Sequence, residues 1–203
     1  MQDGVREINR QALDSLSCEV LHLGKIVDDL HELSMADTGV LHLDRRPLDP
    51  IEVLADTLNL FRNRFEQAQI AIQENLKTNK DISLLGDGSR LAQLYGNLLE
   101  NTLRYADAPG TLKIWCILSE AHLTLAFEDS GPGVPEESVA RLFDRLYRVD
   151  SARTRTKGGS GLGLAICRTI VESHGGTISA ANAPSGGLRI EVVLPITSTT
   201  NDV

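Results

Sequence analysis

The sequence predicts an α+β fold in which a mixed β-sheet packs against helices on one of its faces. Its hydrophobic patterns run in the order helix, strands, helix, hairpin, helix and strand pair. This order lacks the strict strand–helix alternation of a doubly wound parallel fold. The 203 residues fit one domain of ordinary size with an appendage. Hydrophobic residues make up 41% of the chain but aromatic residues only 4%, so the core must be mainly aliphatic.

The first helix is predicted to begin near Asn9, a residue type that favours the N-cap position. Aliphatic residues then recur at spacings of three and four, at Leu13, Leu16, Val20, Leu23, Val27 and Leu30. Such a heptad seam belongs to a helix that packs lengthwise against another helix. No partner is evident elsewhere in the sequence, so we expect either a self-associating helix or one half of a helical hairpin.

A polar connector with two arginines and two prolines, at residues 45–50, follows this helix. It predicts a domain boundary, with residues 1–42 as a helical segment, residues 43–198 as the globular domain and residues 199–203 as a tail. The segment from Thr197 to the C-terminus is expected to be disordered.

Within the globular domain each predicted element depends on a periodic pattern or a cap. Asp49-Pro50 predicts a helix start, because Asp is a good N-cap and Pro suits the first helical position. Apolar spacing predicts further helices at 89–105, 137–143 and 162–171. Short strands are expected at 70–73 and 82–85, and alternating apolar residues predict strands at 112–118, 123–127 and 188–194, the last as half of a strand pair.

Composition and charge exclude several classes of function. The net charge of −8 argues against a general nucleic-acid binder. No apolar run approaches the ~20 residues that span a bilayer, and no signal peptide is recognisable at Met1. Three cysteines without a CxxC pair predict reduced thiols in a cytoplasmic protein, and neither a disulfide framework nor a zinc site.

The stretch from Thr156 to Ala165 holds four glycines in six residues just before a predicted helix. The backbone amides of such a loop can surround a phosphate at the helix N-terminus, although a G-x-G pattern also occurs in plain turns. A basic segment without periodicity, residues 148–160, leads into the glycines. The stretch is therefore not a Rossmann turn, which follows a strand. Nor is it a Walker A loop, in which the lysine follows the glycines.

Two further groups of polar residues are candidates for chemistry. Asn97, Asn101 and Arg104 are spaced i, i+4, i+7 and form one stripe on the predicted helix 89–105. They are either surface and capping residues, or their amide oxygens coordinate a hard cation such as Mg²⁺. Asp129 begins a DxGxG turn at the end of a strand, which is either a simple Asp-Gly turn or a carboxylate that accepts a hydrogen bond from an exocyclic amine.

Four ordered segments carry a family resemblance. They are Asn97-Leu98-Leu99-Glu100-Asn101, Asp129-Ser130-Gly131-Pro132-Gly133, Leu142-Phe143-Asp144-Arg145-Leu146-Tyr147-Arg148 and Gly159-Ser160-Gly161-Leu162-Gly163-Leu164. Together they resemble the N, G1, F and G2 boxes of the histidine kinase catalytic domain, a branch of the Bergerat-fold (GHKL) ATPases. The resemblance covers about residues 12–196 and implies a two-layer Bergerat sandwich. Within the family, the chain looks most like the envelope-stress type of sensor kinase.

The resemblance implies ATP and Mg²⁺ as ligands. By position, Asn101 would bind the metal, Asp129 would read the adenine amine, and residues 148–160 would form a lid over the triphosphate. The implied ATP-binding residues are Asn97, Asn101, Arg104, Tyr105, Asp129, Gly131, Gly133, Arg148, Lys157, Gly159, Ser160, Gly161, Leu162, Gly163 and Leu164.

The resemblance also implies a protein-histidine kinase, which passes the γ-phosphoryl group of ATP to a His and then to an Asp of a response regulator. Related ATPases carry a Glu near the position of Asn97. Because an amide cannot take a proton from water, we expect ATP to be held for transfer and not hydrolysed.

The first helix resembles the end of the dimerisation and phosphotransfer hairpin of these kinases. Their acceptor block, S-H-E-L-R-T-P, is missing, since His31-Glu32-Leu33 imitates it without the Arg-Thr-Pro. We therefore assign no catalytic residue and expect no self-phosphorylation by this fragment. The other histidines, His174 among them, are expected in surface or packing roles.

The implied partners are a response regulator, the protein's own phosphotransfer helix and, in the full-length protein, a second copy of the chain. The full-length protein would be anchored in the bacterial inner membrane, with this part in the cytoplasm. Two alternatives stay open. One is a GHKL-type ATPase or an anti-sigma-type serine kinase. The other is a non-catalytic nucleotide-binding interaction module, because Ser130 and Leu146 are less usual in their boxes.

Overall fold

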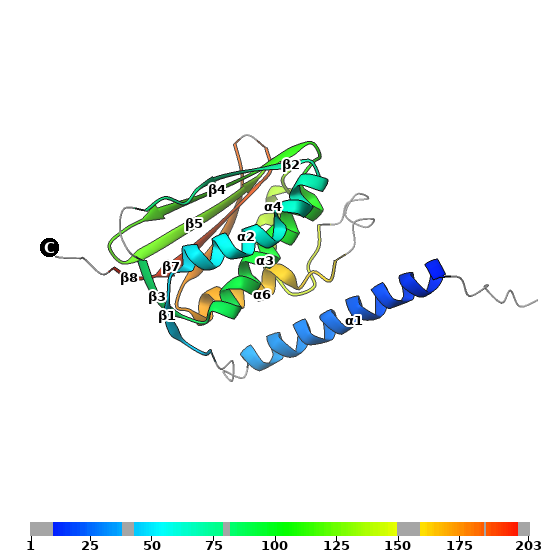
Figure 1. The fold of residues 1–203 in the computed structure, drawn as a ribbon, viewed down its shortest axis with the longest axis horizontal. Helices are drawn as coiled ribbons and strands as arrows, with labels where there is room; N and C mark the ends of the chain where they lie inside the picture. Colours follow the sequence, from blue (N-terminus) through cyan, green and yellow to red (C-terminus); the bar gives the residue numbers. More distant parts are fainter. Residues whose placement is uncertain (1–9, 38–42, 79–81, 150–158, 185, 199–203) are drawn as a thin grey trace, which may run out of the picture.

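The computed structural model describes residues 10–37, 43–78, 82–149, 159–184 and 186–198, which form a two-layer sandwich with one long helix beside it (Figure 1). One layer is a five-stranded sheet. The other consists of three helices that all cover the same face of that sheet, α2 (Pro50–Gln67), α3 (Gly88–Tyr105) and α6 (Gly163–Ser173). This arrangement confirms the predicted α+β class.

The sheet is mixed, as predicted. Its strands lie in the order β2 (Ile70–Asn75), β4 (Gly110–Leu118), β5 (His122–Asp129), β7 (Leu188–Pro195) and β6 (Thr177–Asn182). Only β2 and β4 are parallel, and every other neighbouring pair is antiparallel. Alternation puts the buried residues of β4, β5 and β7 on the helical face, where they form an aliphatic core.

The cap predicted at Asp49 is confirmed, whereas Asn9, the cap predicted for the first helix, lies outside the described residues. The Asp49 carboxylate accepts a hydrogen bond from the amide of Ile51 at 2.7 Å, and α2 starts at the following proline. Asp87 caps α3 in the same way, accepting from the amides of Ser89 and Arg90 at 3.0 and 3.2 Å. The short helix α4 (Glu136–Val139) is smaller than the predicted helix 137–143, because turns replace helix from Ala140 onward.

A second, three-stranded sheet contains two strands that the sequence did not predict. β1 (Arg46–Leu48) and β8 (Thr197–Ser198) both pair antiparallel with β3 (Ile82–Gly86). The prediction of a polar connector at residues 46–48 was therefore wrong, as was the prediction of disorder at residues 197–198. Strands of three and two residues are too short to show a period, and their partner is distant in the sequence.

The long helix α1 (Arg10–Asp37) has two different sides. The predicted seam, from Leu13 to Leu30, is solvent-exposed at all six positions, with exposed fractions between 45 and 66%. The opposite side faces the domain, where Leu33 is 1% exposed and α1 contacts α6. Within the described part of this chain, nothing covers the seam. Nor does any described helix combine the length and apolarity that a bilayer span requires.

His174 joins the ends of two helices from a buried position. Its Nε2 accepts a hydrogen bond from the amide of Asp87 at 3.0 Å, so its Nδ1–H donates to the carbonyl of Ile170 at 2.8 Å. Burial lowers the pKa of His174, which keeps the ring in the neutral form that this pairing needs. Asp87 also accepts from the amide of Asp44, at 3.1 Å, so the same point anchors the chain that leads into β1. Of the two roles expected for His174, surface or packing, the structure shows packing.

The hydroxyl of Tyr95 has no hydrogen-bond partner among the described residues, although the side chain is fully buried against Phe127. An unpaired buried hydroxyl costs free energy, so removing it should not destabilise the fold. We expect Tyr95→Phe to leave the free energy of unfolding unchanged or to raise it by ~1 kcal/mol in denaturant titration. A truncation in the same helix, Leu98→Ala, should lower it by about 2–5 kcal/mol. A clear loss of stability in Tyr95→Phe would show that the hydroxyl is paired.

Candidate functional site

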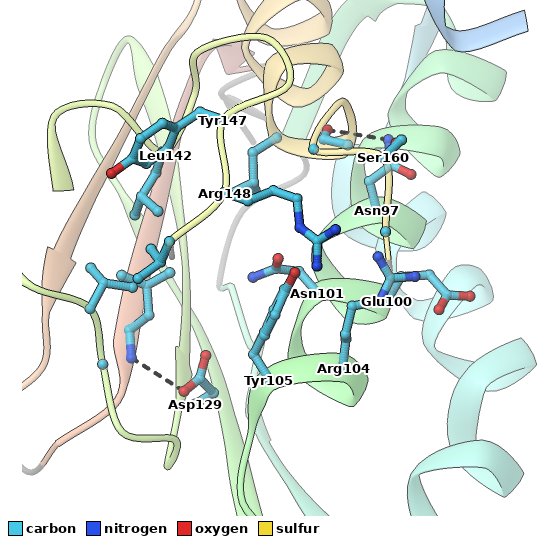
Figure 2. A pocket seen from close by; sticks show the side chains of 18 of the residues that line it. Asn97, Glu100, Asn101, Arg104, Tyr105, Asp129, Leu142, Tyr147, Arg148 and Ser160 are labelled. Carbon is cyan, nitrogen blue, oxygen red and sulfur yellow. Dashed lines mark hydrogen bonds between the residues drawn. The ribbon is translucent and has the colours of Figure 1, made fainter. Parts of the chain in front are cut away.

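A cavity of about 600 Å³ opens beside α3, at the end of the sheet where β5 finishes. Its walls come from α3, from the turn after β5, from the segment 142–149 and from the glycine-rich start of α6 (Figure 2). Segments that lie far apart in the sequence therefore meet in one place.

The predicted polar stripe of α3 faces this cavity. Asn97, Asn101 and Arg104 line it from successive turns, and Tyr105 stands at the end of the stripe (Figure 2). The amide of Asn97 donates a long hydrogen bond, 3.5 Å, to the carbonyl of Gly163 and so ties α3 to the start of α6. The stripe is half-buried and lines the cavity, which argues against a plain surface role.

Glu100 also lines the cavity, but its carboxylate is engaged by α2. Arg64 donates two hydrogen bonds to it, at 2.6 and 3.0 Å, and this pairing raises the pKa of Arg64. A carboxylate held as an anion by a bidentate guanidinium is a poor general base.

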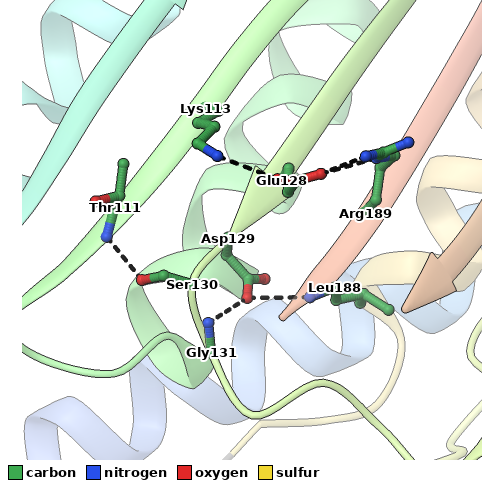
Figure 3. Close-up of polar contacts among 8 residues, drawn as sticks. All are labelled: Thr111, Lys113, Glu128, Asp129, Ser130, Gly131, Leu188 and Arg189. Atoms are coloured by element: carbon green, nitrogen blue, oxygen red, sulfur yellow. Dashed lines mark hydrogen bonds and ion pairs between the residues drawn. The ribbon is translucent and has the colours of Figure 1, made fainter. Parts of the chain in front are cut away.

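Asp129 is 8% exposed and uses only one carboxylate oxygen for hydrogen bonding within the described chain. Its Oδ1 accepts from the amide of Gly131 at 2.8 Å and from the amide of Leu188 at 3.2 Å (Figure 3). The other oxygen faces the cavity (Figure 2). Burial raises the pKa of Asp129, although the two amide hydrogen bonds oppose this rise. A buried carboxylate with one free oxygen is a directional acceptor for a ligand's N–H group.

The neighbouring carboxylate, Glu128, points to the opposite face of the sheet and is paired there (Figure 3). Arg189 donates to it at 2.9 and 2.6 Å, and Lys113 at 3.4 Å. Burial would raise the pKa of Glu128, but these hydrogen bonds and charges outweigh burial and hold the pKa below its usual value. The Arg189 guanidinium lies over the ring of Trp115, 5.2 Å from its centroid. Two adjacent carboxylates thus have pKa values shifted in opposite directions.

Glycines permit the close approach of backbone around Asp129. A Cβ atom on Gly187, whose φ is +89°, would overlap the carbonyl oxygen of Asp129. Only a glycine at this position lets the start of β7 come near enough for Leu188 to donate to the carboxylate.

The predicted glycine loop lies at the opposite side of the cavity. A Cβ atom on Gly159 would meet the guanidinium of Arg104, which therefore packs directly on the loop backbone. Gly161 has φ +72°, and its carbonyl accepts from the amide of Leu146 at 3.0 Å. Leu146 also has a positive φ, +61°, which is unusual for a residue of its size. Two segments of the resemblance therefore interlock at this point.

The structure brings most predicted site residues together. Those that line the cavity are Asn97, Asn101, Arg104, Tyr105, Asp129, Gly133, Arg148, Gly159, Ser160, Gly161, Gly163 and Leu164. Gly131 does not line it but supplies the amide that orients Asp129, and the side chain of Leu162 is buried in the core. Lys157 and most of the predicted lid, residues 150–158, lie outside the described residues.

Sequence reasoning missed the apolar and α1-derived parts of the cavity wall. Ile26 and Asp29 of α1 reach it, and Pro132, Val134 and Leu142 give it an apolar side. Pro132 and Leu142 lie within two of the four segments but were not assigned to the site, and no motif marks Ile26, Asp29 or Val134, whose contribution depends on where the chain folds back and not on their type.

The described residues contain no group of three or more His, Cys, Asp or Glu side chains that could hold a metal ion by themselves. Asn101 lines the cavity, and a carboxamide oxygen is the kind of hard donor that suits Mg²⁺. Such a site fits a magnesium ion that takes most of its ligands from water and from phosphates of a bound molecule.

Comparison with known proteins gives a family and several relatives. Residues 86–198 match the model of the family described as histidine kinase-, DNA gyrase B- and HSP90-like ATPase. The chain is 46% identical over 196 residues to the signal transduction histidine-protein kinase BaeS of Escherichia coli K12. This match covers 97% of the chain but 42% of BaeS, so the chain spans about two fifths of that relative's length.

Solved structures agree with this match. The histidine kinase AdeS of Acinetobacter baumannii superposes with a TM-score of 0.77 at 28% identity, covering 98% of this chain and 89% of that one. The histidine kinase ThkA, solved in complex with the response regulator protein TrrA, has a TM-score of 0.72, covering 96% of this chain and 53% of that one. Its identity of 22% indicates a shared fold alone.

The opposite pKa shifts of Asp129 and Glu128 predict opposite effects of neutralising them. The pKa of folded Asp129 is above that of the unfolded chain, about 3.9, so its ionisation destabilises the fold at neutral pH. Asp129→Asn keeps an acceptor for the two amides, and we expect its unfolding midpoint in urea at pH 7 to equal or exceed that of the unchanged chain. Any advantage should vanish as the pH falls toward 4, because Asp129 then becomes neutral too.

Glu128→Gln is the matched control. The pKa of folded Glu128 is below its unfolded value, about 4.3, so its charge stabilises the fold above that pH and the effect is lost in acid. Glu128→Gln should therefore unfold at lower urea at pH 7. Equal losses in the two variants would contradict the assignment of opposite shifts.

Proposed function

This chain belongs to the family of histidine kinase-, DNA gyrase B- and HSP90-like ATPases and carries the ATP-binding domain of a sensor histidine kinase, and we propose that it holds Mg·ATP for transfer of the γ-phosphoryl group to a histidine. The observation that carries this proposal is the single free oxygen of buried Asp129, directed into a cavity whose other side is polar. Such a cavity has one end suited to the base of a nucleotide and another end suited to its phosphates.

The base end of the site would be formed by Asp129 and the turn that follows it. The free carboxylate oxygen accepts a hydrogen bond from the exocyclic amine of adenine, while the other oxygen of Asp129 stays fixed by the amides of Gly131 and Leu188. Pro132 and Val134 supply an apolar wall for the ring. A base that presents a carbonyl in place of the amine would meet a buried negative charge there.

The phosphate end would lie between α3 and the start of α6. The α6 N-terminus presents backbone amides and a positive dipole end, and Arg104 and Arg148 add charge from two other segments. Figure 2 shows Arg148 reaching across the cavity toward the stripe of α3. Asn101 would hold Mg²⁺, which neutralises phosphate charge when it is bound. By its place in the sequence, Lys157 would act at the same end.

Two features support transfer over hydrolysis. Asn97 lines the cavity near the position where, by the resemblance, related ATPases carry a Glu, and an amide cannot accept a proton from water. The nearest carboxylate on the helix, Glu100, is engaged by Arg64. The GHKL-type ATPase is therefore the weaker alternative.

We further propose that α1 is the remnant of the phosphotransfer hairpin, within residues 1–42, and that the acceptor histidine lies on a helix outside this sequence. The exposed seam of α1 is the surface on which the partner helix and a second copy of the chain would pack. Since ThkA is solved with a response regulator, we propose such a regulator as the phosphoryl acceptor here. The full-length protein would be membrane-anchored, with this part cytoplasmic.

Replacing Asn101 should weaken metal-dependent binding specifically. We expect Asn101→Ala to lower the affinity for ATP in the presence of Mg²⁺ about tenfold or more, with a much smaller change when EDTA is present. Isothermal titration calorimetry measures both. The control is Asn63→Ala, an exposed asparagine of α2 that does not line the cavity. An equal loss with and without Mg²⁺ would refute the metal role of Asn101.

The chain as given should bind Mg·ATP without labelling itself. Incubation with γ-labelled ATP is expected to leave no acid-labile label on the protein, because His31 lacks the surroundings of a phosphoacceptor. Rapid release of inorganic phosphate would favour an ATPase, and an acid-stable phosphoserine on a partner protein would favour a serine kinase. Stable, acid-labile labelling of the chain itself would overturn the assignment.

A further inference from the structure

The side chain of Asn182, the last residue of β6, forms hydrogen bonds with the turn that follows Asp129. Its Oδ1 accepts from the amide of Val134 at 2.9 Å, and its Nδ2 donates to the carbonyl of Val134 at 2.8 Å. The carboxamide therefore pairs with both backbone groups of one residue, as a neighbouring strand would. A third hydrogen bond, from Nδ2 to Glu136 at 3.3 Å, reaches the first residue of α4.

The turn is built to admit this side chain. Gly133 has φ +70°, and a Cβ atom on it would lie 2.7 Å from the Oδ1 of Asn182. A residue other than glycine would meet both a disfavoured backbone conformation and the carboxamide. Gly133 thus provides space for Asn182 as well as part of the cavity wall.

Asn182 is also connected to the second donor of Asp129. Its backbone pairs in register with Leu188 of β7, whose amide donates to the carboxylate. The first donor, Gly131, belongs to the turn that the Asn182 side chain holds. Both amides that fix Asp129 are therefore in segments that contact this one residue, although Asn182 does not itself line the cavity.

We propose that Asn182 is a positioning residue for the base end of the site, which sets how strictly the site requires an exocyclic amine on the bound base. This inference rests on the proposed function. With the turn held at Val134, the segment from Asp129 to Val134 is fixed at both ends, and Asp129 presents its free oxygen in one direction. Without the hydrogen bonds from Asn182, the turn samples other conformations. The apparent affinity for the nucleotide then falls in proportion to the fraction of molecules in which the site is assembled.

The test compares ATP with inosine triphosphate, which carries an oxygen in place of the exocyclic amine. In Asn182→Ala we expect the dissociation constant for Mg·ATP to rise on the order of tenfold. The constant for inosine triphosphate should rise less, because its oxygen cannot donate to Asp129 and gains nothing from the fixed direction of that carboxylate, so the preference for ATP shrinks. Hydrogen exchange should speed up at the amide of Val134 and stay slow at the core amide of Leu125.

The pair of hydrogen bonds between Asn182 and Val134 is called the clamp below. Two control variants separate loss of the clamp from the general effects of a substitution in its neighbourhood. Glu136→Gln removes a charge beside Asn182 but keeps both hydrogen bonds to Val134, and it should bind both nucleotides like the unchanged chain. Ser179→Ala changes an exposed residue of the same strand and should also have no effect.

If Asn182→Ala keeps the same affinity for ATP and the same preference over inosine triphosphate while the unchanged chain binds ATP, the inference fails and the proposed function stands. Unchanged exchange at Val134 would also overturn it, because no clamp would then exist. Failure of the unchanged chain to bind ATP would overturn the proposed function, and this inference with it.

Discussion

A buried carboxylate must be hydrogen bonded or protonated, and Asp129 meets this condition on one side only. Its Oδ1 takes two backbone amides, one from the turn that follows it and one from the start of β7. Both donors must approach very closely, which explains why a side chain at Gly187 would overlap the Asp129 carbonyl. The need for a glycine at position 187 follows from satisfying this one oxygen while leaving the other for a ligand.

The adjacent residue shows the opposite solution. Glu128 sends its carboxylate to the outer face of the sheet and surrounds it with cations, which stabilises its charge. Because side chains alternate along a strand, the two neighbouring acids of β5 point to opposite faces of the sheet and have different roles. One supports the sheet, and the other leaves part of its hydrogen-bonding capacity unused in the protein, a cost that is typical of binding sites.

The helices, the longer strands and the polar stripe of α3 could be predicted because each is a local, repeated pattern. The predicted cap at Asp49 and the stripe of Asn97, Asn101 and Arg104 are of this kind. β1 and β8 could not be predicted, since they are short and stabilised by distant β3. The roles of Asn182 and Arg64 could not be predicted for the same reason. Their roles depend on partners 48 and 36 residues away, and no spacing rule relates residues across such gaps.

The stacking of Arg189 on Trp115 makes the fluorescence of this tryptophan sensitive to the structure around it. Trp115 is the only tryptophan of the chain, and the guanidinium above it also holds Glu128, the residue next to Asp129. Indole emission responds to a nearby cation and to its distance from the ring. A ligand that shifts the end of β5 would therefore alter the intrinsic fluorescence from the far face of the sheet.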